Sequence, residues 1–523
     1  MVLAELDIIK EIIDYEQLLD QINTNIMVRG EYLIPDTHPD VVEILQVDSK
    51  AIITNKEVQQ ERLYIEGKLN FNVSYLAKED EGFGVRCVNW NDKFAHYVDL
   101  AGSDNRFVCD TECEIEHIDA NIINERKISL ETKTKIGCDV YDAGEFEYVK
   151  DIEGSNDIEM KRKTEVFDKV VYKKSFDMVG KCNLKVAMDK NQIGSIVKCK
   201  VDLHKKEVKI SDGKVELSCY CKIEAIYRDL DSRELNILEE DLCVSQEEDI
   251  DNINMDMIST ASFRANSVNY LVSKDDLGED RILDIEILID GDLKVTSKEH
   301  IEIIEDAYSP SRNMELKKDI KNISLLIDRG SSEYIVKDNI EIDSERGAPI
   351  QIISTIGKII NLEKRINDGK VLLDGIIGVD VLYKTSDEER GIGKVIGEIP
   401  FSTIIDIPKV KEDMKALVKS CIETIQANIE ANTIGIKAII TSVVDVFKSF
   451  KKACITSIDE KEEEMPSKKA SLTIYVVQRG DTIWDLAKKY NSTISELVNI
   501  NDFENPEDII VGEKIIIPGR ALL

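Results

Sequence analysis

The stretch "LYIEGKLNFNVSY" at Leu63–Tyr75 places an apolar residue or glycine at every second position, with mostly polar residues between them. Alternation with a period of two is typical of a β-strand that buries one face. Two further stretches align with it without a gap, "VELSCYCKIEAIY" at Val215–Tyr227 and "VLLDGIIGVDVLY" at Val371–Tyr383, and each also ends in tyrosine. Three copies of one strand predict an internal repeat of three related units.

The similarity extends to the segments that flank the three strands. Matching segments lie upstream at 27–34, 178–186 and 335–342, and downstream at 115–141, 422–447 and, more loosely, 280–295. The turns "SDGK" at 211–214 and "NDGK" at 367–370 predict hairpins. Each unit therefore spans on the order of 130 residues, which is an ordinary domain size. We predict mainly β repeats that resemble sandwiches or small barrels, with one short helix at 38–46.

Charged, poorly patterned stretches separate the units and predict the domain limits. The expected organisation is unit 1 at 7–145, unit 2 at 165–305, unit 3 at 320–450, a flexible linker at 459–471 and a separate module at 472–523.

Two cysteines of the second copy, Cys219 and Cys221, raise the question of a metal site. They occupy positions at which the first copy has Gly67 and Leu69, so the repeat predicts that they are small core residues. The chain has 11 cysteines and no CxxC pair, which fits free thiols in a reducing compartment. We expect neither a metal ion nor a cofactor.

The net charge of -34 disfavours partners that carry phosphate. We therefore expect no nucleic-acid binding, and no binding to anionic lipid by charge alone. The first residues, "MVLAELDIIKEIIDYEQLL", place charges within every apolar run, which is unlike a secretory signal. Because no uninterrupted apolar run reaches about 18 residues, we expect no direct membrane insertion and a cytoplasmic protein.

The last fifty or so residues have a different pattern. "LTIYVVQRGDT" predicts a short strand and a turn, after which Ile483, Leu486, Ala487 and Tyr490 recur with helical spacing. A second short helix is expected at 492–501, and "GEKIIIP" predicts a closing strand. The module is therefore expected to be a small α+β domain with the order strand, helix, helix, strand.

This module resembles the LysM domain through "YVVQRGDTIWDLAKKY" and "LVNINDFENPEDIIVGEKIIIP". The resemblance implies a shallow groove between two loops, which in the family binds N-acetyl sugars of peptidoglycan or chitin. Carried over, the groove residues are Gly480, Asp481, Thr482, Ile483, Trp484, Asn505, Pro506, Asp508, Ile509 and Ile510. Two interpretations of Trp484 stay open: an exposed binding anchor, or a cover for the small core.

The repeats resemble the SPOCS domain of anaerobic endospore formers, through "IPDTHPDVVEILQV" at 34–47 and the strands that end in tyrosine. Several such repeats followed by one LysM domain resemble a family of spore coat morphogenetic proteins. The resemblance implies a non-catalytic scaffold in the mother-cell cytoplasm, at the forespore surface in the spore coat. Its implied partner is stage IV sporulation protein A, the coat ATPase, bound through LysM, with other coat proteins as further candidates.

We expect no enzyme activity. The five histidines are scattered, and the sequence contains no phosphate-binding loop and no nucleophile elbow. Repetition of one strand-rich unit also suits a scaffold better than a catalytic site. Two alternatives remain: a peptidoglycan-binding protein of the cell wall or spore cortex, and a wall hydrolase whose site lies in the repeats.

Overall fold

The computed structural model describes residues 7–79, 82–100, 107–153, 157–232, 234–342, 347–387, 391–461, 472–503 and 509–518. Strands dominate it, and both helices lie in the C-terminal module. The flexible linker expected at 459–471 falls largely outside the described residues, although β18 continues to Glu460.

Each of the three repeat units contains six strands in the same order. Unit 1 has β1 (Asp7–Leu33), β2 (Val41–Gln59), β3 (Arg62–Glu79), β4 (Gly82–Asp99), β5 (Phe107–Asn124) and β6 (Lys127–Glu153). Unit 2 has β7 (Glu159–Lys185), β8 (Ile193–Ser211), β9 (Lys214–Asp229), β10 (Leu235–Asp249), β11 (Ile258–Lys274) and β12 (Asp280–Tyr308). Unit 3 has β13 (Met314–Glu341), β14 (Pro349–Asn367), β15 (Lys370–Thr385), β16 (Ile392–Asp406), β17 (Lys415–Glu430) and β18 (Thr433–Glu460).

Within each unit the strands form two antiparallel three-stranded sheets with buried apolar side chains between them, in one cluster in units 1 and 2 and in two clusters in unit 3. In unit 1 the sheet orders are β1-β6-β5 and β2-β3-β4, and units 2 and 3 repeat this topology. The predicted mainly β, sandwich-like repeats are confirmed. The repeated stretches that defined the units are β3, β9 and β15, the middle strands of the second sheets. Their final tyrosines, Tyr75, Tyr227 and Tyr383, are at most 1% exposed.

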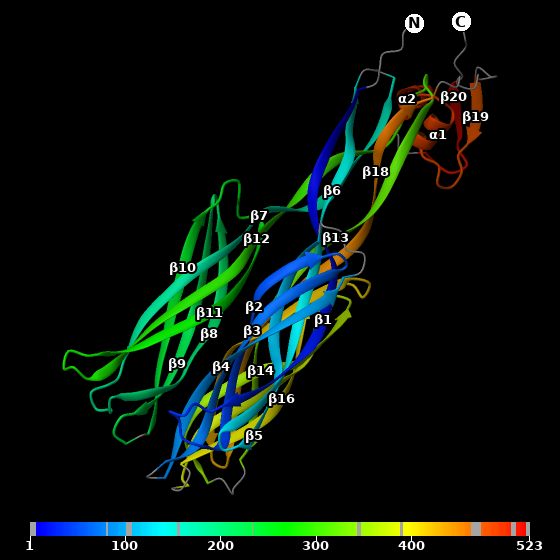
Figure 1. The fold of residues 1–523 in the computed structure, drawn as a ribbon. Coiled ribbons are helices and arrows are strands. Elements are labelled where there is room, and N and C mark those ends of the chain that lie inside the picture. The colour runs from blue at the N-terminus through cyan, green and yellow to red at the C-terminus, as the bar shows by residue number, and fades with distance from the viewer. Residues whose placement is uncertain are drawn as a thin grey trace.

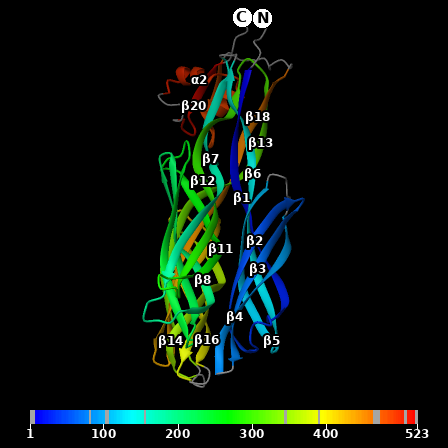
Figure 2. The ribbon, with the colours of Figure 1, turned by 60° about the vertical axis from the view of Figure 1, so that its left-hand side comes forward.

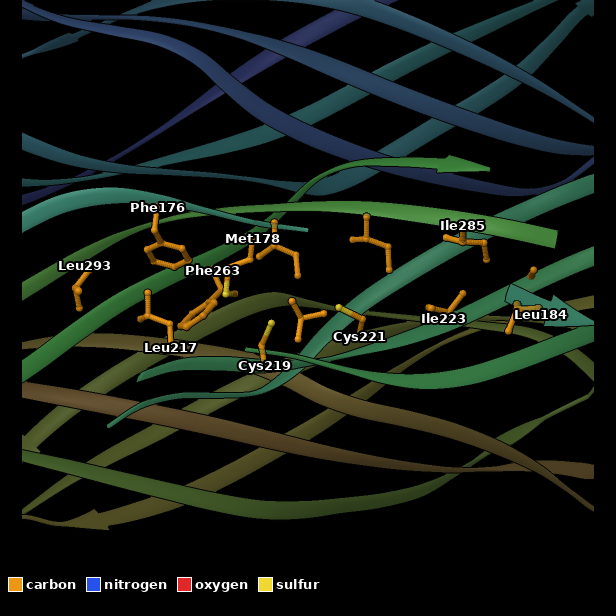
Figure 3. Packing of buried hydrophobic residues seen from close by; sticks show 14 of the residues in the cluster. Phe176, Met178, Leu184, Leu217, Cys219, Cys221, Ile223, Phe263, Ile285 and Leu293 are labelled. Carbon is orange, nitrogen blue, oxygen red and sulfur yellow. The ribbon is translucent and has the colours of Figure 1, made fainter. Parts of the chain in front are cut away.

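The core of unit 2 contains the two cysteines of the CxC motif. Cys219 and Cys221 point from β9 into a cluster that includes Phe176, Met178 and Phe263, and both are 0% exposed (Figure 3). Cys219 takes a position at which unit 1 has Gly67, whose Cα faces Phe94 so closely that a Cβ would lie 2.2 Å from the ring. In unit 1 the Phe94 ring therefore limits the position to glycine, whereas in unit 2 the paired residue is Val244, which leaves room for the Cys219 side chain.

The helix expected at 38–46 is wrong. Strand β2 begins at Val41 and pairs with β3, and its register slips after Val41, after Ile44 and again after Ile53. Each bulge adds one residue and shifts the buried face. Val41 and Ile44 consequently face the core of unit 1 three positions apart, as in a helix, although the backbone is extended. Leu45 is buried in a different cluster, which the three units share.

The long first and last strands of each unit extend beyond the sandwich as a two-stranded ribbon. The three ribbons pack together in a stem, which rises above the three sandwiches in Figures 1 and 2. Apolar clusters fill the stem and draw residues from all three ribbons, among them Phe146, Phe167, Ile303 and Ile323. Since each ribbon alone has no second layer to cover its apolar face, the three are stable only together.

The sandwiches also meet one another, around a common axis. Leu45, Val197 and Ile353 occupy equivalent positions of β2, β8 and β14 and share one buried cluster. The next residue in each strand is polar. The ammonium group of Lys198 donates to Gln46 Oε1 (3.2 Å) and to Ser354 Oγ (3.0 Å). The units therefore pack with approximate threefold symmetry, but the side chains at the axis differ.

Asp380 of β15 lies beside this axis and gives a pH-dependent prediction. Burial raises the pKa of Asp380 to about 6, against the opposing effect of Gln46 and nearby lysines. The folded state thus favours the protonated carboxyl, so its contribution is favourable below the unfolded pKa near 4 and is lost as pH rises through about 6. Asp380→Asn should raise the free energy of unfolding by about 1–3 kcal/mol at pH 7–8. Urea denaturation at pH 4, 6 and 8 tests this. A gain of equal size at all three would contradict it.

No helix in the part of the chain that the structure describes is both long and apolar enough to cross a membrane.

Candidate functional site

The C-terminal module has the predicted order of elements. It contains β19 (Leu472–Val476), α1 (Ile483–Lys489), α2 (Ile494–Ile500) and β20 (Lys514–Pro518). Strands β19 and β20 pair antiparallel, and both helices pack on one face of this sheet through Leu486, Ala487 and Leu497. Thr493 and Glu496 form a capping box that fixes the start of α2.

The first loop of the predicted groove is held together by its own side chains. Gly480 has a φ of +94°, which favours glycine. The carboxylate of Asp481 accepts hydrogen bonds from the Tyr475 hydroxyl (2.9 Å) and the backbone N–H of Gln478 (2.8 Å). The hydroxyl of Thr482 caps α1 by accepting from the N–H of Asp485 (3.1 Å). These residues shape the loop, which leaves Gly480 and Thr482 exposed.

The second loop is described only in part. Asn505, Pro506 and Asp508 lie outside the described residues. Ile509 packs against the core of the module, whereas Ile510 is 69% exposed. Ile483, from the first loop, is 2% exposed and belongs to the same core. Of the ten groove residues, Gly480, Thr482 and Ile510 are thus the described ones with an open surface.

Trp484 is buried at a contact between the module and the stem. It is 9% exposed, and its ring meets the Tyr308 ring edge-on with centroids 5.1 Å apart. The indole N–H donates to Asp306 Oδ2 (3.0 Å), and Lys488 binds the same carboxylate at 2.6 Å. The hydroxyl of Tyr308 donates to the carbonyl of Ser492 (2.9 Å). Trp484 therefore covers the module's core and anchors the module on β12.

Sequence reasoning missed Asp306 and Tyr308. Both lie in unit 2, more than 170 positions from α1, and no motif links them to the module. The equivalent ends of the other two ribbons carry Glu153 and Asp459 in place of Tyr308. The one signal in the sequence was Tyr308 itself, an aromatic residue at a position where the other two units have an acidic residue. Burial raises the pKa of Asp306, but hydrogen bonds from Lys488 and Trp484 outweigh burial and hold it below its ordinary value.

We expect Asp306→Ala to release the module from the stem without unfolding either. Loss of the carboxylate removes two charge-assisted hydrogen bonds, worth about 1–3 kcal/mol each. In a Trp90→Phe background Trp484 is the only tryptophan. Its emission should shift to longer wavelength in the variant as the ring becomes hydrated. Asp151→Ala, at the equivalent position of the unit 1 ribbon, is the matched control and should leave the emission unchanged. An unshifted emission in Asp306→Ala would mean that the aromatic contact alone holds the module.

Comparison with known proteins identifies both parts of the chain. The model "SipL, SPOCS domain" matches residues 40–123, 192–273 and 350–430. The model of the LysM domain matches residues 475–518. The chain contains three SipL-type SPOCS segments, one in each unit, and a C-terminal LysM domain. Units 1, 2 and 3, with their stem strands, are called SPOCS domains 1, 2 and 3 below. The three SPOCS matches begin at or beside the second strand of each unit and end within or at the end of the fifth, so the long strands of the stem lie outside them.

A curated relative matches the LysM domain alone. The cortical fragment-lytic enzyme of Bacillus subtilis (strain 168) is 38% identical over 47 residues, which is 9% of this chain and 11% of that protein. The chain thus spans about a tenth of the length of this relative. No solved structure matches the chain. The SPOCS and LysM domains identify a sporulation-related protein, and such domains are in general non-catalytic.

Proposed function

We propose that this protein is a non-catalytic spore coat morphogenetic scaffold, which binds stage IV sporulation protein A through its LysM domain. It acts in the mother-cell cytoplasm, at the forespore surface, and promotes coat assembly there. The observation that carries the proposal is the position of the LysM domain. Three SPOCS domains pack together through shared apolar clusters, and Trp484 anchors LysM at the far end of their stem (Figure 1).

The side chains that LysM leaves exposed support a protein ligand. Ile510 and Val511 are 69% and 62% exposed at the second loop. Exposed aliphatic side chains gain free energy from contact with apolar groups of a protein partner. Trp484, which could have stacked on a sugar ring, is turned toward the stem instead. Repeated docking onto a polymer would add avidity to a weak single contact.

Binding to peptidoglycan is the alternative function. It is favoured by the LysM fold itself and by the relative that carries a similar LysM segment, which is a cortical fragment-lytic enzyme. Under this alternative the exposed loops recognise N-acetyl sugars in the cell wall or spore cortex.

One pull-down with the full chain separates the two functions. We expect retention by immobilised stage IV sporulation protein A and none by insoluble peptidoglycan. Ile510→Arg should weaken retention by the ATPase at least about tenfold, because a central apolar contact is worth more than about 1.4 kcal/mol. Ile396→Arg is the matched control, since Ile396 is 68% exposed on β16 of SPOCS domain 3. Retention by peptidoglycan alone would establish the alternative. Undiminished binding by Ile510→Arg would remove the second loop from the site.

A further inference from the structure

One level of the stem carries a different pair of residues in each ribbon. The cross-strand pairs at this level are Ile13 with Phe146, Glu165 with Ile301, and Lys321 with Lys452. The three pairs are equivalent, because in each ribbon the first-strand residue of the pair lies five positions before a slip in the pairing register. The slips follow Leu18, Val170 and Leu326. Apolar, acidic and basic residues thus occupy the same place in SPOCS domains 1, 2 and 3.

The three ribbons lie around a common axis, and the last strand of each ribbon contacts the first strand of the next. At this level the side chains that meet are complementary. The last strand of domain 3 meets the first strand of domain 2 through an ion pair between Lys452 and Glu165, which are 5% and 11% exposed. Lys163, beside Glu165, also pairs with its carboxylate (2.7 Å). The ammonium group of Lys452 additionally lies 4.7 Å from the centre of the Phe167 ring, also in domain 2. Lys452 therefore depends on domain 2 for every one of these contacts.

The other two contacts at this level use different chemistry. The last strand of domain 1 meets the first strand of domain 3, where Lys321 lies 5.8 Å from the centre of the Phe146 ring and donates to the carbonyl of Glu145 (2.8 Å). In the third contact Ile301 of domain 2 and Ile13 of domain 1 lie in one buried apolar cluster. The level therefore contains an ion pair, a cation–π contact and an apolar contact.

The reverse circular order would pair the same residues badly. Lys452 would meet Ile13, Lys321 would meet Ile301, and Glu165 would meet Phe146. Lys452 would then be a buried ammonium group without an anion, which is among the costliest arrangements in a protein interior. Glu165 would keep only Lys163 of its own strand. The observed order therefore satisfies each charge, and the reversed order does not.

A second level, among the sandwiches, favours the same order. Arg228 of domain 2 forms a two-pronged ion pair with Glu79 of domain 1, with both distances 2.6 Å. Lys384, at the equivalent position of domain 3, pairs with Glu234 of domain 2 at 2.9 Å. In each case a cation reaches back to a carboxylate of the preceding domain. Domain 1 has Leu76 at this position, and Leu76 lies in the apolar cluster at the axis.

We propose that these unlike contacts at equivalent positions encode the circular order of the three SPOCS domains. Each domain has a side whose residues pair favourably with one of the two other domains and unfavourably with the remaining one. The order also brings the unit 2 ribbon, with Asp306 and Tyr308, under the LysM domain. The specificity resides in charge and aromatic pairing, since the apolar ring of Leu45, Val197 and Ile353 is alike in all three domains.

Three full-chain variants test the proposal by their thermal midpoints. Glu165→Ile removes the anion and should lower the Tm by about 10 °C, because Lys452 is left buried and without its main partner. Glu165→Ile with Lys452→Ile copies the apolar contact of domains 1 and 2 and should restore the Tm. Ile13→Glu with Glu165→Ile moves the carboxylate to domain 1 at constant composition. In that variant Lys452 meets its anion only in the reversed order.

Zero-length carbodiimide cross-links report the order directly. Lys384–Glu234 (2.9 Å) and Lys419–Glu112 (2.9 Å) are accessible pairs between domains, and Lys181–Glu286 (2.6 Å) is an accessible reference pair within domain 2. The wild type and the double-isoleucine variant should give all three. The moved-carboxylate variant should keep the reference and lose more than about half of both interdomain products. Wild-type yields and Tm in that variant, or a double-isoleucine Tm as low as that of Glu165→Ile, would overturn the proposal.

Discussion

Glu79→Ala is expected to destabilise the protein by about 3–5 kcal/mol, because it leaves a buried guanidinium group without its anion. Arg228 is 4% exposed and Glu79 10% exposed, and Arg86 approaches the same carboxylate at 2.8 Å. Urea denaturation at pH 7 would measure the loss. Asp99→Ala is the matched control, since Asp99 pairs with Arg62 at a surface where its side chain is 83% exposed. That control should cost less than about 1 kcal/mol.

The same residue predicts how acid weakens the contact between SPOCS domains 1 and 2. The hydrogen bond from Arg228, against the opposing effect of burial, lowers the pKa of Glu79 to about 2. Its stabilisation is thus fully present above the unfolded pKa near 4.3 and is lost as pH falls toward 2. The stability difference between wild type and Glu79→Ala should therefore shrink between about pH 4.5 and pH 2. A difference that stays constant over this range would show that the ion pair does not stabilise the interface.

Ile483→Glu is expected to unfold the LysM domain. Ile483 is 2% exposed in a core of few side chains, and a carboxylate there would have no partner among the apolar residues of the cluster. Burial of such a charge costs several kcal/mol, which is comparable with the whole stability of a domain this small. Hydrogen exchange should show lost protection across 472–503 and 509–518, while protection in the SPOCS cores remains.

The matched control for this variant is Ile510→Glu. Ile510 is 69% exposed, so the same substitution should leave the LysM core intact. Ile483→Glu should abolish binding whichever ligand the domain has, whereas Ile510→Glu affects binding only if the second loop forms the contact. A folded LysM domain in Ile483→Glu would mean that the helix can turn the glutamate out to solvent.

The repeated strands were predictable because their burial pattern can be read within a single short stretch of sequence. In β3, β9 and β15 the side chain that faces the core alternates with one that does not, so a period of two was visible in the residues themselves. The same holds for LysM, in which the glycine turn, the caps and the helical spacing all lie within a short stretch. The helix expected at 38–46 failed for a physical reason: two bulges in β2 reproduce helical spacing in an extended chain.

Alternation, turn motifs and helical spacing were enough to predict three β-rich repeats, buried cysteines in the second and a LysM-like module at the end. They did not predict that the long terminal strands form a common stem, or that Trp484 faces Asp306 and Tyr308. Contacts between the units, and between unit 2 and the LysM domain, join residues more than 130 positions apart, and several of them are ion pairs. Alternation shows that a side chain is buried, but not which neighbour covers it. That neighbour is set by the order in which the three domains pack around their axis.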